Sequence, residues 1–180
     1  NGVKELFNNA VLNDELHEAG HTFSSANSIN WGRLAPQIVY YFEAYLEAVA
    51  TGKVKFGDEV NFTVPTGNFG NILAGYYARE MGLPVGRLIC AANANDVLKD
   101  FIRTGTYDRR RDFFKTISPS MDILISSNLE RLLFLVSGGD KGLVSGLMDK
   151  LKKEGSYTIE PSLLEKIQSV FYSESTDDPG

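Results

Sequence analysis

Residues 64–71, which read Val-Pro-Thr-Gly-Asn-Phe-Gly-Asn, limit the possible folds of this chain more than any other stretch. Before them, apolar residues at Val60, Phe62 and Val64 alternate with other residues and predict a strand, and residues 72–81 after them have a helical pattern. A strand that turns through two glycines into a helix directs several backbone N–H groups at one point, where the helix dipole adds positive charge. The turn is therefore suited to bind an anion such as phosphate. The alternative is an ordinary turn whose glycines only supply positive φ.

Two strands and the helix between them indicate the fold class. Strand patterns over residues 59–64 and 87–92 enclose a helical pattern over 70–81, in which small residues such as Ala74 and Gly75 allow close packing on a sheet. This alternation predicts right-handed βαβ units. We therefore expect an α/β fold with a parallel sheet and helices on both faces.

Composition and charge limit the classes of partner. The 180 residues are 43% hydrophobic and 23% charged, and the net charge of −5 predicts no general attraction to nucleic acid or to an anionic membrane. No apolar run is long enough to span a bilayer. The single cysteine, Cys90, lies in an apolar run and favours a buried thiol in a reducing, cytoplasmic compartment. The chain begins without an initiator Met, so we expect it to be a piece of a longer protein.

A second polar cluster precedes the first strand. Asn27, Ser28 and Arg33 offer neutral donors and one forked cation at the start of a helix, a set suited to a phosphate monoester. The alternative is a structural helix start, in which Asn30 caps the helix and Arg33 forms a surface salt bridge. We expect the regular helix to begin near Leu34, with Pro36 in its first turn.

The histidines near the N-terminus predict no metal site. His17 and His21 lie four residues apart beside glutamates, but the HExxH pattern is absent, so we expect a polar loop. Residues 21–23 have the composition of a short strand.

Four further expectations concern the second half of the chain. We expect Asp96 to cap a helix and Arg109–Arg111 to lie on a solvated surface without a ligand. Ser127 and Glu130 have the spacing of a capping box. Apolar residues predict a final helix over 163–171, followed by a polar tail.

Several motifs together resemble threonine synthase, and its bacterial and fungal branch more than its plant branch. They are Ser24–Leu34, Val64–Gly75, Met81–Pro84, Leu88–Asn93 and Ser118–Leu124. The family depends on pyridoxal 5'-phosphate (PLP), has a tryptophan-synthase-β-like fold, and converts O-phospho-L-homoserine and water to L-threonine and phosphate.

The resemblance implies two groups of binding residues. Those expected at the phosphate of PLP are Gly67, Asn68, Phe69, Gly70 and Asn71. Those expected at the phosphate of the substrate are Asn27, Ser28 and Arg33, with Asn30 as a weaker candidate. Asn93 is expected to line the site from the end of its strand.

The resemblance also implies which parts are missing. In this family a lysine in a Phe-Lys-Asp setting forms the Schiff base with the cofactor, and no lysine here has that setting. We therefore expect no catalytic residue in this chain, no activity from it alone, and the remainder of the parent chain as its partner. The implied division is the edge of a smaller domain over 1–26, most of the large PLP-binding domain over 27–172, and the polar tail over 173–180. The oligomeric state is left open.

Two alternatives to threonine synthase remain at this point. One is a sister PLP lyase, such as a serine/threonine dehydratase or a threonine-synthase-like phospho-lyase. The other is a non-catalytic module that uses the glycine turn for another anion.

Overall fold

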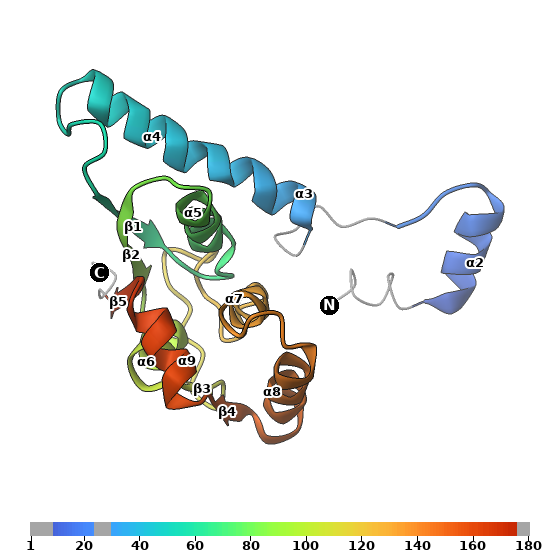
Figure 1. The fold of residues 1–180 in the computed structure, drawn as a ribbon. Helices are drawn as coiled ribbons and strands as arrows, with labels where there is room; N and C mark the ends of the chain where they lie inside the picture. Colours follow the sequence, from blue (N-terminus) through green and yellow to red (C-terminus); the bar gives the residue numbers. More distant parts are fainter. Residues whose placement is uncertain (1–8, 24–29, 176–180) are drawn as a thin grey trace.

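The computed structural model describes residues 9–23 and 30–175 (Figure 1). The elements in chain order are α2 (Ala10–Glu18), α3 (Trp31–Leu34), the 3-10 turn η1 (Ala35–Gln37), α4 (Ile38–Ala50), β1 (Val60–Pro65), α5 (Gly70–Glu80), β2 (Val85–Ala92), α6 (Val97–Thr104), β3 (Thr106–Asp108), α7 (Leu129–Val136), α8 (Lys141–Glu154), β4 (Ser156–Thr158), α9 (Pro161–Gln168) and β5 (Phe171–Ser175). None of the helices described is long and apolar enough to cross a membrane.

The main sheet is parallel and has the strand order β1-β2-β5. Val64 of β1 lies opposite Cys90 of β2, which lies opposite Ser173 of β5. The β1–α5–β2 unit confirms the predicted βαβ arrangement and α/β class, with bounds within two residues of those expected. A second sheet pairs β3 with β4 antiparallel.

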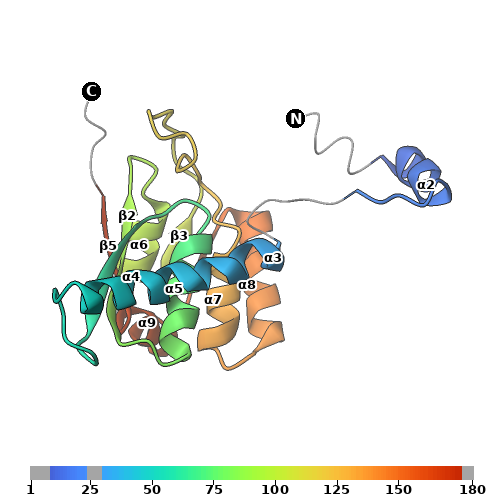
Figure 2. The ribbon, with the colours of Figure 1, turned by 90° about the horizontal axis from the view of Figure 1, so that it is seen from above.

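Helix α5 packs between α4 and the sheet (Figure 2). A Cβ on Gly75 would lie 2.6 Å from Cε1 of Tyr41 in α4 and 2.9 Å from Cδ2 of Leu88 in β2. Ala74 and Ala78 are fully buried. The small residues of this helix therefore permit the close packing expected of them, because any larger side chain at position 75 would displace one of its neighbours.

Helix α6 lies on the same face of the sheet as α5. Ser173 shares its face of β5 with Phe171, whose ring contacts Tyr76 of α5, and the Ser173 hydroxyl donates to the backbone O of Lys99 in α6 at 3.2 Å. On the other face, side chains such as Thr63 and Arg87 are exposed. Helices on that second face therefore remain a prediction.

Strand β5 corrects the predicted final helix. Helix α9 ends at Gln168, and residues 171–175 pair with β2, including part of the expected tail. The ring of Phe171 is buried and its centroid lies 5.4 Å from that of Phe69. Because burial against the sheet and pairing with β2 are tertiary effects, they override the local helical pattern.

The N-terminal expectations are wrong in two places. His17 lies in helix α2 rather than in a loop, and the side chain of Asn9 caps that helix by accepting from the Leu12 N–H at 3.1 Å. Residues 21–23 form no strand. In both views α2 stands apart from the other elements (Figures 1 and 2).

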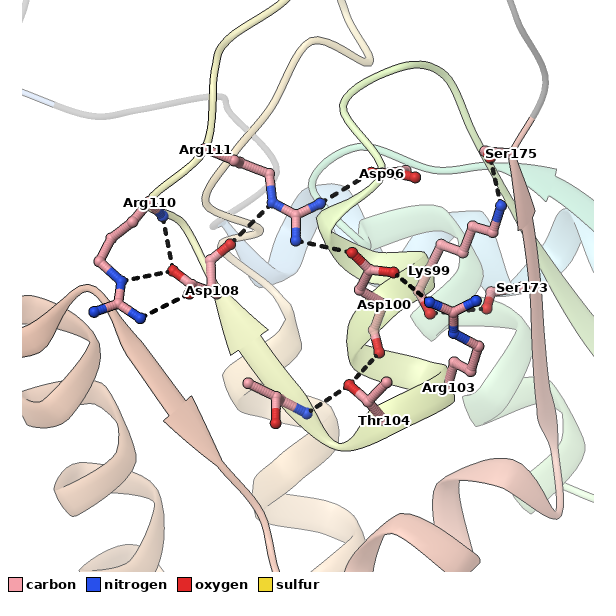
Figure 3. Close-up of polar contacts among 11 residues, drawn as sticks. Asp96, Lys99, Asp100, Arg103, Thr104, Asp108, Arg110, Arg111, Ser173 and Ser175 are labelled. Carbon is pink, nitrogen blue, oxygen red and sulfur yellow. Dashed lines mark hydrogen bonds and ion pairs between the residues drawn. The ribbon is translucent and has the colours of Figure 1, made fainter.

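Two of the three consecutive arginines, Arg110 and Arg111, pair with acidic side chains, and Arg111 departs from the predicted solvated surface (Figure 3). Arg111 lies 2.9 Å from a carboxylate oxygen of Asp96 and 2.9 Å from one of Asp100, and its side chain is only 26% exposed. Asp96 occupies the N-cap position of α6 but makes no capping bond. Arg110 pairs with Asp108 and lowers the pKa of that carboxyl group to about 2. Arg111 therefore ties the start of α6 to the segment after β3.

Candidate anion-binding site

The turn between β1 and α5 has one residue in the left-handed region. Phe69 has φ of 62°, the single positive φ among the non-glycine residues described, and its side chain is buried. Neither Gly67 nor Gly70 has a positive φ, so the alternative in which these glycines only supply it is wrong. Instead, a Cβ on Gly67 would lie 3.0 Å from the backbone O of Ser120. The glycine at this position permits the close approach of a second chain segment.

The N–H groups of this turn face no acceptor from the described part of the chain. The N–H of Thr66 donates to the O of Ala91 at 2.9 Å, and the N–H of Leu73 donates to the O of Phe69 at 3.1 Å. For the backbone N–H groups of residues 67–72 no hydrogen bond is recorded among the residues described. Consecutive unpaired donors at the N-terminus of an 11-residue helix form a positive site that an anion can satisfy.

Arg33 and the turn line one cavity of about 320 Å³. The full lining is Arg33, Gln37, residues 65–72, Ser120 and Met121. The structure therefore brings together the glycine turn and one of the three predicted substrate-phosphate residues. The other two, Asn27 and Ser28, lie outside the described residues.

Local hydrogen bonds place Arg33 at the cavity. The side chain of Asn30 caps α3 by accepting from the Gly32 N–H at 2.9 Å. The side chain of Gln37 donates to the backbone O of Arg33 at 2.7 Å. Asn30 therefore caps the helix, which was the alternative to a role in phosphate binding.

A segment 60 residues further along the chain holds the turn. The Ser126 hydroxyl donates to the O of Gly67 at 2.8 Å, and Asn128 donates to the O of Asn68 through its backbone N at 3.2 Å and its side-chain Nδ2 at 2.9 Å. The predicted capping box is wrong, because α7 begins at Leu129 with Asn128 at its N-cap and no side-chain capping bond. No local signal near residue 128 identifies a partner this distant in sequence.

Asn71 is held from the opposite side by helix α4. The hydroxyl of Tyr41 lies 2.6 Å from Oδ1 and 2.9 Å from the backbone O of Asn71. Burial raises the pKa of Tyr41 above its ordinary value, so this hydroxyl stays protonated and acts as a donor.

Asn93 supports the wall of the cavity and does not line it. Its Nδ2 donates to Asp122 at 2.8 Å, and Asp122 also accepts from the N–H of Thr116 at 2.9 Å. The hydrogen bond from the Thr116 N–H is the largest of the effects that hold the pKa of Asp122 below its usual value. These bonds fix the loop that carries Ser120 and Met121 to the end of β2.

No family model matches the chain. Human threonine synthase-like 1 is 49% identical over 174 residues, which are 96% of this chain and 23% of that protein. Threonine synthase from Eremothecium gossypii is 42% identical over 93% of this chain and 34% of that protein. The crystal structure of PLP-bound threonine synthase from Brucella melitensis is 46% identical, with a TM-score of 0.86, over 97% of this chain and 35% of that one.

The parallel sheet and its crossover helices therefore have the α/β fold of the PLP-bound threonine synthase structure. In sequence the chain is homologous to a segment of the threonine synthases and the threonine-synthase-like proteins. It spans between about a quarter and about a third of the length of these relatives.

Proposed function

We propose that the protein carrying this chain is a PLP-dependent threonine synthase, which converts O-phospho-L-homoserine and water to L-threonine and phosphate. In this proposal residues 67–71 bind the phosphate of PLP, and Arg33 binds the phosphate of the substrate. The observation that carries the proposal is the shared cavity, in which Arg33 faces a turn whose N–H groups have no acceptor among the residues described.

The residues at the turn fit the phosphate of this cofactor. Several backbone N–H groups at a helix N-terminus can donate to one phosphate, and the helix dipole favours its negative charge, so no cationic side chain is needed there. The close relatives named threonine synthase and the PLP-bound structure support the same cofactor here. When bound, PLP supplies an electron sink for carbanion chemistry, and the protein supplies placement and proton transfer.

Arg33 is the cation proposed for the substrate phosphate. Its planar guanidinium can form two parallel hydrogen bonds to one phosphate. The charge on the phosphate grows as it leaves, so a fixed cation there stabilises the transition state more than the bound substrate. Asn27 and Ser28 would add neutral donors to the same group.

The test is a product assay on the full-length protein that contains this chain. With O-phospho-L-homoserine and PLP, we expect inorganic phosphate and L-threonine in equal amounts. Phosphate release without threonine, or no release at all, would contradict the proposal. The isolated chain is a useful comparison, because we propose that it is inactive without the rest of the parent protein.

The second candidate is a threonine-synthase-like phospho-lyase. It is favoured by the higher identity to human threonine synthase-like 1, at 49%, than to the Eremothecium enzyme, at 42%. Elimination of phosphate without water addition would yield a 2-oxo acid and ammonia after hydrolysis. These two products, measured in place of threonine, would favour this candidate.

A further inference from the structure

We propose that Asn128 is a positioning residue, whose side-chain amide holds the Asn68–Phe69 peptide so that the N–H groups of the turn point at the phosphate of PLP. This inference rests on the proposed function, because it names what directs the donors of that same site.

The argument begins with the two carbonyl groups of the turn. Ser126 donates to the O of Gly67, and Asn128 donates twice to the O of Asn68. In a trans peptide the C=O and the following N–H point in opposite directions. Fixing the O of Gly67 on one side therefore directs the N–H of Asn68 to the other, and fixing the O of Asn68 does the same for the N–H of Phe69.

The lining of the cavity indicates that it lies on the side of the turn away from these anchors. Asn68 and Phe69 both line it, and no acceptor from the described residues meets their N–H groups. Ser126 and Asn128 do not line it. Asn128 thus acts on the phosphate site through the backbone of the turn and without touching a ligand itself.

The orientation of the Asn128 amide is itself determined. The side chain is completely buried, and its Oδ1 accepts a hydrogen bond from Nη1 of Arg131, one turn later in α7. A guanidinium can only donate, so Oδ1 must face Arg131 and Nδ2 must face the O of Asn68. An asparagine at the N-cap position commonly accepts from a backbone N–H of its helix, whereas the Asn128 side chain makes no such capping bond.

The experiment compares two ligands that differ only in the phosphate group. Dissociation constants for PLP and for pyridoxal are measured on the full-length protein that contains this chain, and on its Asn128→Asp variant. Aspartate keeps the shape and the acceptor for Arg131, but it replaces the Nδ2 donor with an oxygen that repels the O of Asn68. Ser127→Ala is the matched control, because within residues 9–23 and 30–175 the Ser127 hydroxyl bonds only to the side chain of Asn68, at 3.4 Å.

We expect Asn128→Asp to raise the dissociation constant for PLP about 10- to 100-fold, as for loss of one or two hydrogen bonds to a charged group. The constant for pyridoxal should change less than about twofold by the same reasoning, since the change acts only on phosphate donors. Ser127→Ala should leave both constants unchanged. If Asn128→Asp does not fold, Ser126→Ala removes the milder anchor at Gly67, and we expect it to weaken PLP binding selectively by about 3- to 10-fold.

Three results would overturn the inference. The variant could bind PLP as the wild type does, or it could lose PLP and pyridoxal in equal proportion, which would make Asn128 a residue of general stability. In either case the wild-type preference for PLP over pyridoxal would leave the proposed function standing. A wild-type protein without that preference would instead refute the phosphate site, and Asn128 with it.

Discussion

Replacing Gly67 with alanine tests the closeness of the turn to the loop that covers it. A Cβ at this position would lie 3.0 Å from the backbone O of Ser120, 3.1 Å from Cδ1 of Ile123 and 3.2 Å from Cα of Met121. Two of these three atoms belong to backbone, so a rotamer change cannot relieve the contact. Either the turn or the loop must move by a few tenths of an ångström.

The size of the effect follows from two opposing contributions. Overpacking one methyl group in a closely packed region costs about 1–3 kcal/mol. Because Gly67 does not have a positive φ, alanine adds no backbone strain, and it reduces the entropy of the unfolded chain by about 0.4–1 kcal/mol. We therefore expect the free energy of unfolding to fall by about 1.3 kcal/mol, the difference between the midpoints of those two ranges.

Urea denaturation of the 180-residue chain at 25 °C measures this change, with Gly146→Ala as the matched control. Gly146 lies inside α8, and a Cβ added there would meet no atom within 4 Å, so alanine at this position should stabilise the chain by about 0.5–1 kcal/mol. In the full-length protein, Gly67→Ala should also weaken PLP binding, because it displaces the turn or the loop beside it. If Gly67→Ala is as stable as wild type and binds PLP equally well, the close approach does not constrain the site.

Three further predictions concern single residues. In the full-length protein, Arg33→Ala should raise KM for O-phospho-L-homoserine and lower kcat while the PLP absorbance stays intact; loss of PLP binding instead would make Arg33 structural. Asp122→Asn should destabilise the chain at pH 7 in urea denaturation and have little effect well below pH 3.8. The pKa of Asp122 is lower in the folded chain than the ordinary value of 3.8, first because of the hydrogen bond from the Thr116 N–H. The ionised carboxylate therefore stabilises the fold at pH values above the unfolded pKa, and this stabilisation is lost as the pH falls through the folded pKa. Burial raises the pKa of Cys90 to about 11, so the thiol should react with a disulfide reagent at pH 8 far more slowly in the folded chain than in urea, and equal rates would contradict its burial.

The features that could be predicted from the sequence are those encoded within a short stretch. The alternation of Val60, Phe62 and Val64, the glycine turn and the small residues of α5 all act on neighbours in the chain, and β1–α5–β2 has the predicted form. The resemblance to threonine synthase depends on the same stretch and on four others, and the comparisons confirm it.

The features that could not be predicted depend on distant partners. Residues 171–175 form a strand because β2 offers them an edge, although the predicted final helix included Phe171 and the predicted polar tail included Ser173. Arg111 has the local setting of a surface residue, but in the fold it is half-buried and pairs with Asp96 and Asp100. A charge run in a sequence carries no information on which acids the fold brings to it.

The proposed anion-binding turn combines both cases. Its capacity to bind comes from its own residues, since a helix N-terminus after two glycines exposes donors wherever it occurs. Its direction comes from elsewhere, because the carbonyl groups of Gly67 and Asn68 are held by Ser126 and Asn128. A peptide of residues 60–81 alone would contain every backbone donor of the turn but neither anchor. We therefore predict that the sequence motif supplies the donors for a phosphate, and that Ser126 and Asn128, just before α7, set the direction in which those donors point.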